Sequence, residues 1–257
     1  MDISFYTAGA GARAQQSKLD VIGNNMSNVN TTAYKSQSAG FADLLYSNIR
    51  DDANKNTQLK VGSGVRLEKT DSNFASGGPQ ATDNPTDYMI VGSGFFAVQD
   101  PGTNEIFYTR DGNFRRSIRS DGNFYLATAN GELVLDSDLK PINLSPKKTK
   151  NSANNSNTSN NSKDSKDMEE VKEPGVFDFK IKDGMLLKGN NLFSPVAKNG
   201  QPVLQENAKV EKGYLELSNV EVSSEMSKLI ETQRAYSMSL KMIQTSNEIE
   251  EVINNLR

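Results

Sequence analysis

The stretch Phe5–Val29, FYTAGAGARAQQSKLDVIGNNMSNV, decides the fold, because its apolar and small residues recur in steps of three and four. That spacing places them on one face of a helix as a heptad seam. The seam contains one polar member, Gln15, and its alanines would let a neighbouring helix approach closely. The seam consists of Phe5, Ala8, Ala12, Gln15, Leu19, Ile22, Met26 and Val29. The run Asn28–Thr32 ends the helix, because Asn and Thr side chains compete for backbone hydrogen bonds.

A second seam occupies the other end of the chain. Ser218–Glu221 matches a capping box, in which Ser and Glu side chains bind the exposed amides at the start of a helix. No Gly or Pro falls between Ser218 and Arg257, so one long helix is predicted there. Its stripe contains Met226, Leu229, Gln233, Tyr236, Leu240 and Ile243, and then re-phases to Ile249, Ile253 and Leu256.

The region between these seams has a different period. From about residue 61 to 210, short apolar runs alternate with Gly, Pro, Asn and Asp, which predicts a β-rich domain. The sequence DGNF at 111–114 recurs at 121–124, and Asp-Gly is a strong signal for a tight turn, so two hairpin corners are expected. A calcium loop is the alternative, but its ligand spacing fails after the third position.

These patterns divide the chain into three parts. Residues 1–60 are expected to be an N-terminal helical segment, with a second short helix at Phe41–Tyr46. Residues 61–210 form the β-rich middle domain, and residues 211–257 form the C-terminal helical segment. Within the middle, residues 149–167 are nearly all Asn, Ser, Lys and Asp, so this stretch is predicted to be a disordered loop.

The composition excludes several classes of function. The 257 residues carry a net charge of −3, which gives no reason to expect a nucleic-acid partner. There is no Cys and no His, so thiol nucleophiles, Ser-His triads and the usual zinc sites are excluded. We expect no catalytic residue, no cofactor and no metal. The longest uncharged apolar-leaning run, Tyr88–Val98, is too short to span a membrane. Since the opening residues lack positive charge followed by an apolar run, we expect no cleaved signal peptide.

The layout predicts an α+β fold in which long terminal helices flank a β-rich central domain. A seam-bearing helix is marginal alone in water, so its stripe needs a cover. The simplest cover is the other terminal helix, which gives a coiled-coil-like pair. Periodicity alone leaves two alternatives equally open: a helical hairpin packed on its own domain, and helices that pack against other molecules.

Residues 19–35, LDVIGNNMSNVNTTAYK, closely resemble the N-terminal signature of the bacterial flagellar rod and hook protein family, which reads approximately LDVIANNLANVNTTGFK. The differences are mild and lie at Gly23, Met26, Ser27, Ala33 and Tyr34. Ala33 is the notable one, because Gly adopts a positive φ readily and Ala does not.

Two further blocks resemble the same family. IVGSGFFAV at 90–98, followed by YTRDGNF at 108–114, is similar to its central core. GYLELSNV at 213–220, followed by EM at 225–226 and LIETQRAY at 229–236, is similar to its C-terminal block. Because three motifs occur in the family's order and span both chain ends, the resemblance is specific.

The resemblance implies a structural subunit of the flagellar basal-body rod, most like a distal or proximal rod protein. Such proteins leave the cell through the flagellar export apparatus without a cleaved signal. They polymerise helically with copies of themselves and with other rod and hook subunits, and the rod transmits motor torque to the hook. Their terminal helices form an inner coiled-coil-like tube and the β domain forms the outer layer. The expected location is therefore the basal body in the cell envelope.

The assembly interface is expected on the terminal seams. Its candidate residues are Leu19, Ile22, Met26, Val29, Met226, Leu229, Gln233, Tyr236, Leu240 and Ile243. We hypothesise that the terminal segments are poorly ordered in the free monomer and fold when subunits meet.

Two other functions compete with this interpretation. The first is a soluble coiled-coil adaptor that binds a partner's helix. The second is a nucleotide-binding enzyme, because Gly92–Ala97 matches G-x-G-x-x-A. A dinucleotide site needs a helix directly after that motif, whereas Val98–Pro101 reads as a strand end and a turn.

Overall fold

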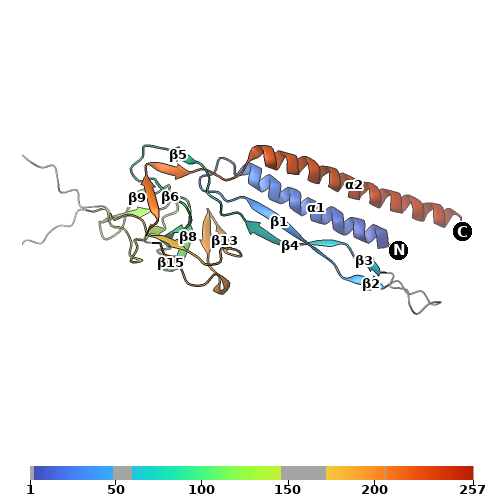
Figure 1. Ribbon diagram of the computed structural model, residues 1–257, viewed down its shortest axis with the longest axis horizontal. Helices are drawn as coiled ribbons and strands as arrows, with labels where there is room; N and C mark the ends of the chain where they lie inside the picture. Colours follow the sequence, from blue (N-terminus) through green and yellow to red (C-terminus); the bar gives the residue numbers. More distant parts are fainter. Residues whose placement is uncertain (1–2, 49–59, 146–171, 206, 257) are drawn as a thin grey trace, which may run out of the picture. The chain divides into compact units, whose positions relative to one another are not determined.

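The computed structural model describes residues 3–48, 60–145, 172–205 and 207–256. It divides into two compact units, the ends unit (Met1–Ala75 with Ser218–Arg257) and the middle unit (Ser76–Leu217). An N-terminal helix, a C-terminal helix and a β-rich centre confirm the predicted α+β class (Figure 1). The loop expected at 149–167 lies outside the described residues. Among the residues described, no helix is long and apolar enough to cross a membrane.

The ends unit is built on two antiparallel helices, α1 (Ile3–Ser27) and α2 (Val222–Asn255). Figure 1 shows α2 running beside α1 and continuing beyond the N-terminal end of α1. α1 ends where the sequence predicted, because the chain turns at residues 28–33 with Asn28 accepting a hydrogen bond from the backbone N–H of Thr31.

Contacts near both ends of the helix pair establish the antiparallel direction. The hydroxyl oxygens of Ser4 and Ser246 lie 3.5 Å apart at one end. At the other end, the amide of Asn25 donates a hydrogen bond of 3.1 Å to the carboxylate of Glu225. The two terminal segments therefore meet within one chain.

A two-stranded ribbon packs against α1. It pairs β1 (Gln37–Asp43) with β4 (Val65–Ser72) in an antiparallel register, with an irregularity between Gly40 and Phe41. A smaller ribbon follows, in which β2 (Tyr46–Asn48) pairs with β3 (Lys60–Gly62). Because β4 belongs to this unit, the units divide at residues 75/76 and 217/218, whereas the sequence placed the divisions at 60/61 and 210/211.

The short helix predicted at Phe41–Tyr46 is wrong, because this stretch belongs to β1 and β2 and their connection. Among the described residues of the segment 1–60, α1 is the helix. Phe41 lies opposite Leu67 in the ribbon, and the bonds that hold this strand come from residues 22 or more positions away in the chain. Pairing with a distant strand overrides a weak local helix pattern.

The middle unit contains a nine-stranded antiparallel sheet in its described part. Its strands are β7 (Phe95–Gln99), β8 (Ile106–Thr109), β9 (Arg115–Ile118), β10 (Phe124–Ala127), β11 (Leu133–Val134), β12 (Val176–Asp178), β13 (Leu186–Gly189), β14 (Leu192–Ser194) and β15 (Val203–Leu204). The main path runs β13-β14-β8-β7-β11-β10-β9, and β12 joins β7 to β15. Because β7 is central, its residues Phe95–Val98 are fully buried.

Two short ribbons and one helical turn make up the rest of the regular structure in the described part of this unit. β6 (Tyr88–Val91) pairs with β16 (Lys209–Lys212), β5 (Pro79–Ala81) pairs with β17 (Tyr214–Glu216), and Ala197–Asn199 forms a 3-10 helix. The core below them is one apolar cluster of Tyr88, Ile90, Phe96, Val98, Phe114, Leu126, Val134, Ile142, Val176 and Leu192.

Both DGNF segments are turns closed by their own aspartates. Asp111 accepts the backbone N–H of Asn113 at 3.1 Å, and Asp121 accepts that of Asn123 at 3.0 Å. The second turn closes the β9–β10 hairpin as predicted. The first is no hairpin corner, because β8 and β9 are not paired with each other. There Gly112 is required, since any side chain would collide with the carbonyl oxygen of Tyr88.

Ala33 occupies the position where the resembling family has Gly. Its φ is 55°, in the left-handed region, and the residue is buried. The left-handed conformation brings Cβ too close to the following carbonyl oxygen and costs about 1–2 kcal/mol. The loop after α1 therefore carries local strain.

We predict that Ala33→Gly raises the free energy of unfolding by about 1 kcal/mol, because release of the strain outweighs the larger entropy of glycine in the unfolded chain. Urea unfolding followed by circular dichroism would measure it. Ala39→Gly in β1, where φ is not positive, is the matched control and should destabilise. Equal destabilisation by both changes would contradict the strain at Ala33.

Candidate assembly surface

Asn25 is the centre of a buried polar cluster in the ends unit. Its side chain is 1% exposed and makes four hydrogen bonds. The amide nitrogen donates to the backbone oxygen of Gln37 at 2.8 Å and to Glu225 at 3.1 Å. The amide oxygen accepts from the Tyr34 hydroxyl at 3.1 Å and from the Gln37 backbone at 2.9 Å. Since a carboxamide has two donors and two lone pairs, Asn25 is fully satisfied.

The charge of Glu225 is balanced inside this cluster. Lys228 lies one turn further along α2, and its ammonium group is 2.7 Å from the Glu225 carboxylate. Burial raises the pKa of the Tyr34 hydroxyl, and the nearby Glu225 carboxylate raises it further. Tyr34 therefore stays protonated at neutral pH and remains a hydrogen-bond donor to Asn25.

Asn219 fixes the backbone just before α2. Its amide nitrogen donates to the carbonyl oxygens of Asn73 at 2.7 Å and Ala75 at 3.1 Å. Its amide oxygen accepts the backbone N–H of Ser36 at 2.7 Å. One side chain thus joins the start of β1, the end of β4 and the entry to α2.

The capping box predicted at Ser218–Glu221 is wrong. Glu221 is the N-cap residue of α2, and no side chain caps the helix there. The Ser218 hydroxyl instead accepts the backbone N–H of Val220 at 3.3 Å. The hydrogen bonds of Asn219 hold this backbone extended. α2 therefore begins at Val222, three residues later than a cap at Ser218 requires.

One face of α2 packs against α1, and apolar residues beside that face are exposed. The covered row includes buried Glu225, Thr232 and Ser246. A first exposed set, which we name the N-terminal stripe, is Val222, Met226 and Ile230. A second, the C-terminal stripe, is Met238, Met242, Ile249, Val252, Ile253 and Leu256, with Leu256 82% exposed. At 3.6 residues per turn, Val222 and Met226 lie on one side of the covered row, and Met238, Met242, Ile249 and Leu256 lie on the other. Ile230 and Val252 fall nearest the side opposite the row, and Ile253, seven residues after Ser246, continues the row.

The residues predicted for the interface fall into three environments. Ile22 is buried at 3% exposure and packs inside its own unit. Met226, Gln233 and Leu240 are exposed on α2. The remaining six, Leu19, Met26, Val29, Leu229, Tyr236 and Ile243, are half-buried. Met238 and Met242 were missed, although their steps of four and seven to Ile249 could have revealed the C-terminal stripe.

The middle unit has its own buried polar group at Arg110, whose side chain is 2% exposed. The guanidinium donates to the carbonyl oxygen of Gly92 and to the hydroxyl of Ser76, and its Nε lies 3.4 Å from the Glu216 carboxylate. Glu216 also accepts the backbone N–H of Gly77 at 2.8 Å. Burial lowers the pKa of Arg110, and the Glu216 carboxylate opposes that change. This cluster joins β17 to the beginning of the unit.

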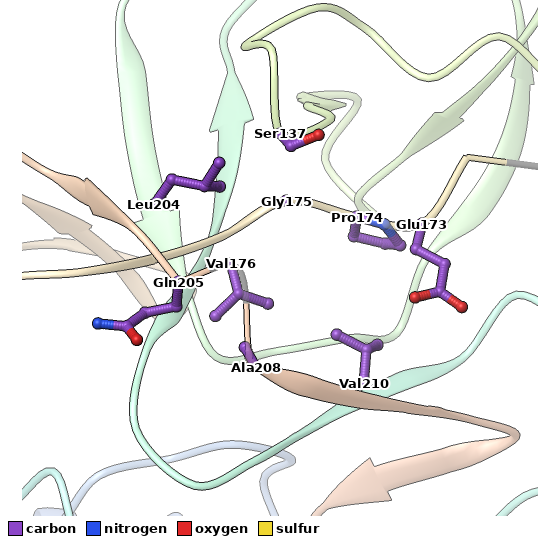
Figure 2. Close-up of a pocket in the computed structure, with 9 residues that line it drawn as sticks. All are labelled: Ser137, Glu173, Pro174, Gly175, Val176, Leu204, Gln205, Ala208 and Val210. Carbon is purple, nitrogen blue, oxygen red and sulfur yellow. The ribbon is translucent and has the colours of Figure 1, made fainter.

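A shallow pocket in the middle unit offers little chemistry (Figure 2). It is lined by Ser137, Glu173, Pro174, Gly175, Val176, Leu204, Gln205, Ala208 and Val210. The Ser137 hydroxyl donates to Asp136, whose carboxylate also pairs with Lys172. Burial raises the pKa of Asp136, but these hydrogen bonds outweigh it and the net pKa is lowered, so Asp136 is a weak base.

Two other chemical alternatives find no support in the described residues. The Gly92–Ala97 motif leads into strand β7, whereas a dinucleotide site needs the N-terminus of a helix at that point. Within the described ranges, no group of three or more Asp and Glu side chains could hold a metal ion.

Three family models match the chain. They are described as "Flagella basal body rod protein" over residues 5–35, "Flagellar hook protein FlgE/F/G D1 domain" over residues 89–158, and "Flagellar basal body rod FlgEFG protein C-terminal" over residues 211–256.

Similar proteins extend the match to nearly the whole chain. The flagellar basal-body rod protein FlgG of Borreliella burgdorferi is 35% identical, and the alignment covers 99% of this chain and 98% of that protein. FlgG of Buchnera aphidicola subsp. Schizaphis graminum is 31% identical over 98% of this chain and 99% of its own length. The flagellar basal-body rod protein FlgF of Mesorhizobium japonicum is 29% identical, and the alignment covers 100% of this chain and 98% of that protein.

The buried pair in the middle unit gives a stability prediction. Arg110→Met should lower the free energy of unfolding by about 3–5 kcal/mol, because it leaves the Glu216 carboxylate buried without its cation. Urea unfolding is the measurement. Lys69→Met removes the exposed Lys69–Asp71 pair and should cost less than about 1 kcal/mol. A loss of the same small size for both variants would refute the assigned role of Arg110.

Proposed function

The chain belongs to the flagellar basal-body rod protein family, and we propose that it is a structural subunit that polymerises helically into the rod and transmits motor torque to the hook. The observation that carries the assembly mechanism is the pair of exposed apolar stripes on α2. Soluble monomers rarely expose such long apolar rows without a partner.

The positions of the stripes favour head-to-tail contacts between copies. The N-terminal stripe lies near the start of α2, mainly on one side of the covered row, and the C-terminal stripe lies toward the end of the helix, mainly on the other side. If the C-terminal stripe of one copy meets the N-terminal stripe of the next, the two surfaces differ. A contact between different surfaces repeats without closing and gives an open helical filament.

The finer parts of the proposal rest on the family resemblance and on these stripes. The helices of many copies would pack in a coiled-coil-like tube, with Leu19, Met26, Val29, Leu229, Tyr236 and Ile243 completing their contacts between copies. Ile22, which is already covered, would support that surface from within. The partners would be copies of this chain and other rod and hook subunits, reached through the flagellar export apparatus.

Removing apolar side chains from the stripes tests this proposal. Met226→Ser with Ile230→Ser, or Met242→Ser with Ile249→Ser, should weaken self-association at least a hundredfold, because each buried aliphatic side chain contributes about 1.5–3 kcal/mol. Sedimentation velocity and electron microscopy of concentrated protein would measure it.

A matched control uses polar positions on the same helix. Glu231→Gln with Lys241→Gln changes exposed residues outside both stripes and should leave association unchanged. The proposal fails if stripe variants associate like the parent chain, or if the parent forms no filaments at any concentration. A partner's helix that binds the stripes while the chain stays monomeric would instead favour the adaptor alternative.

A further inference from the structure

The facing rows of α1 and α2 repeat every seven residues. On α1 the positions are Ser4, Gly11, Lys18 and Asn25, and on α2 they are Ser246, Ser239, Thr232 and Glu225. Three of the four opposite pairs lie close together: Ser4 with Ser246, Gly11 with Ser239, and Asn25 with Glu225. From one pair to the next, the position on α1 rises by seven residues while the position on α2 falls by seven. The two antiparallel helices therefore pair in one continuous register.

Such a repeat leaves the register poorly specified by packing. A shift of one heptad moves α2 by about 10 Å along α1. It still places short polar residues of α2 opposite Gly11, Lys18 and Asn25, and it brings Ile253 opposite Ser4. Gly11 would then face Ser246, which is the same residue type as Ser239. Similar residues at repeated positions discriminate weakly between registers, and a single buried polar residue can do so strongly.

We propose that the Asn25–Glu225 hydrogen bond sets the register of the terminal helices, with Asn25 as the positioning residue. Asn25 differs from the other three members of its row because all its hydrogen-bonding capacity is used, by Tyr34, Gln37 and Glu225. A one-heptad shift would place Thr232 opposite Asn25 and remove the Glu225 carboxylate from its amide donor. Breaking a satisfied buried network disfavours that shift.

The register controls how much of α2 stays uncovered. In the observed register the pairing of Ser4 with Ser246 sets residue 247 opposite the start of α1, so residues 248–256 extend beyond it. Figure 1 shows α2 continuing past the N-terminal end of α1. One heptad of slip in the covering direction would place Ile253 opposite Ser4. Much of the C-terminal stripe would then lie beside α1 of its own chain. This consequence rests on the proposed function, because it keeps the stripe available to the next copy.

Asn219 is a second constraint on the same helix. It holds the backbone before α2 through Ser36, Asn73 and Ala75. A shift of α2 therefore requires release of Asn219 as well as loss of the Asn25–Glu225 bond. The experiment has to separate the two.

Engineered disulfides between α1 and α2 can report the register of the two helices, because the chain has no cysteine of its own. Gly11→Cys with Ser239→Cys reports the observed register, since a Cβ at Gly11 lies 3.7 Å from Ser239 Oγ. Gly11→Cys with Ser246→Cys reports the shifted register. In dilute monomer, the otherwise native chain should cross-link at least tenfold faster in the first pair than in the second.

The variant that removes the register bond is Asn25→Leu with Glu225→Leu. Replacing both partners with apolar groups avoids an unpaired buried charge, so the helices should stay folded by circular dichroism. In an Asn219→Ala background, the rate of 11/246 cross-linking should rise at least tenfold. Asn219→Ala alone should keep the observed register. The matched control, Asn24→Leu with Glu231→Leu, changes exposed residues on the same helices and should also keep it.

Three results would overturn the proposal. One is that Asn219→Ala alone shifts the cross-links, which would assign the register to Asn219. Another is that the variant with Asn25→Leu, Glu225→Leu and Asn219→Ala folds and still cross-links only between cysteines at positions 11 and 239. If that variant does not fold, Asn25→Ser in the Asn219→Ala background decides, because it keeps Glu225 paired with Lys228, and unchanged cross-linking there also overturns the proposal. The cross-links are read in monomers, so the test takes α1 and α2 as paired within the single chain, in contrast to the hypothesis of poorly ordered terminal segments. A failure of filament assembly would therefore leave it unaffected.

Discussion

A single neighbouring helix can cover only one face of α2, and α2 carries apolar residues on more than that face. Within the chain, α1 and α2 meet along a row that includes Glu225, Thr232 and Ser246, so the row facing α1 contains mainly short or polar side chains. The larger apolar side chains of the N-terminal and C-terminal stripes lie outside it. Burial of apolar surface favours association, so the uncovered stripes give the molecule its tendency to bind copies of itself.

Buried polar clusters give this arrangement its specificity. Asn219 fixes where α2 starts, and Asn25 aligns α2 with α1. Arg110 holds the beginning of the middle unit against β17 at its end. Each lies in one of the sequence blocks that resemble the flagellar family. Buried hydrogen-bonded groups contribute little net stability, but misplacing them is costly, so they select one geometry among several that would bury similar apolar area.

The sequence predicted those features that local periodicity controls, and it failed where distant residues decide. The two terminal helices, the β-rich middle and the turn at Asp121 follow from spacing and turn chemistry. The strand at Phe41 depends on Leu67, and the start of α2 depends on Asn219 bonding to β1 and β4, so neither could be found locally. Periodicity located the seam near Met226 but could not say which of its residues face α1 and which face outward.

Hydrogen exchange of the α2 backbone amides, compared between dilute monomer and assembled filament, shows whether copies of this chain meet through the exposed stripes of α2. We expect rapid exchange across residues 248–256 in the monomer, where α1 does not cover them, and strong protection of the same amides in the filament. If those amides exchange at the same rate in both states, the exposed stripes of α2 are not the surfaces through which copies of this chain assemble.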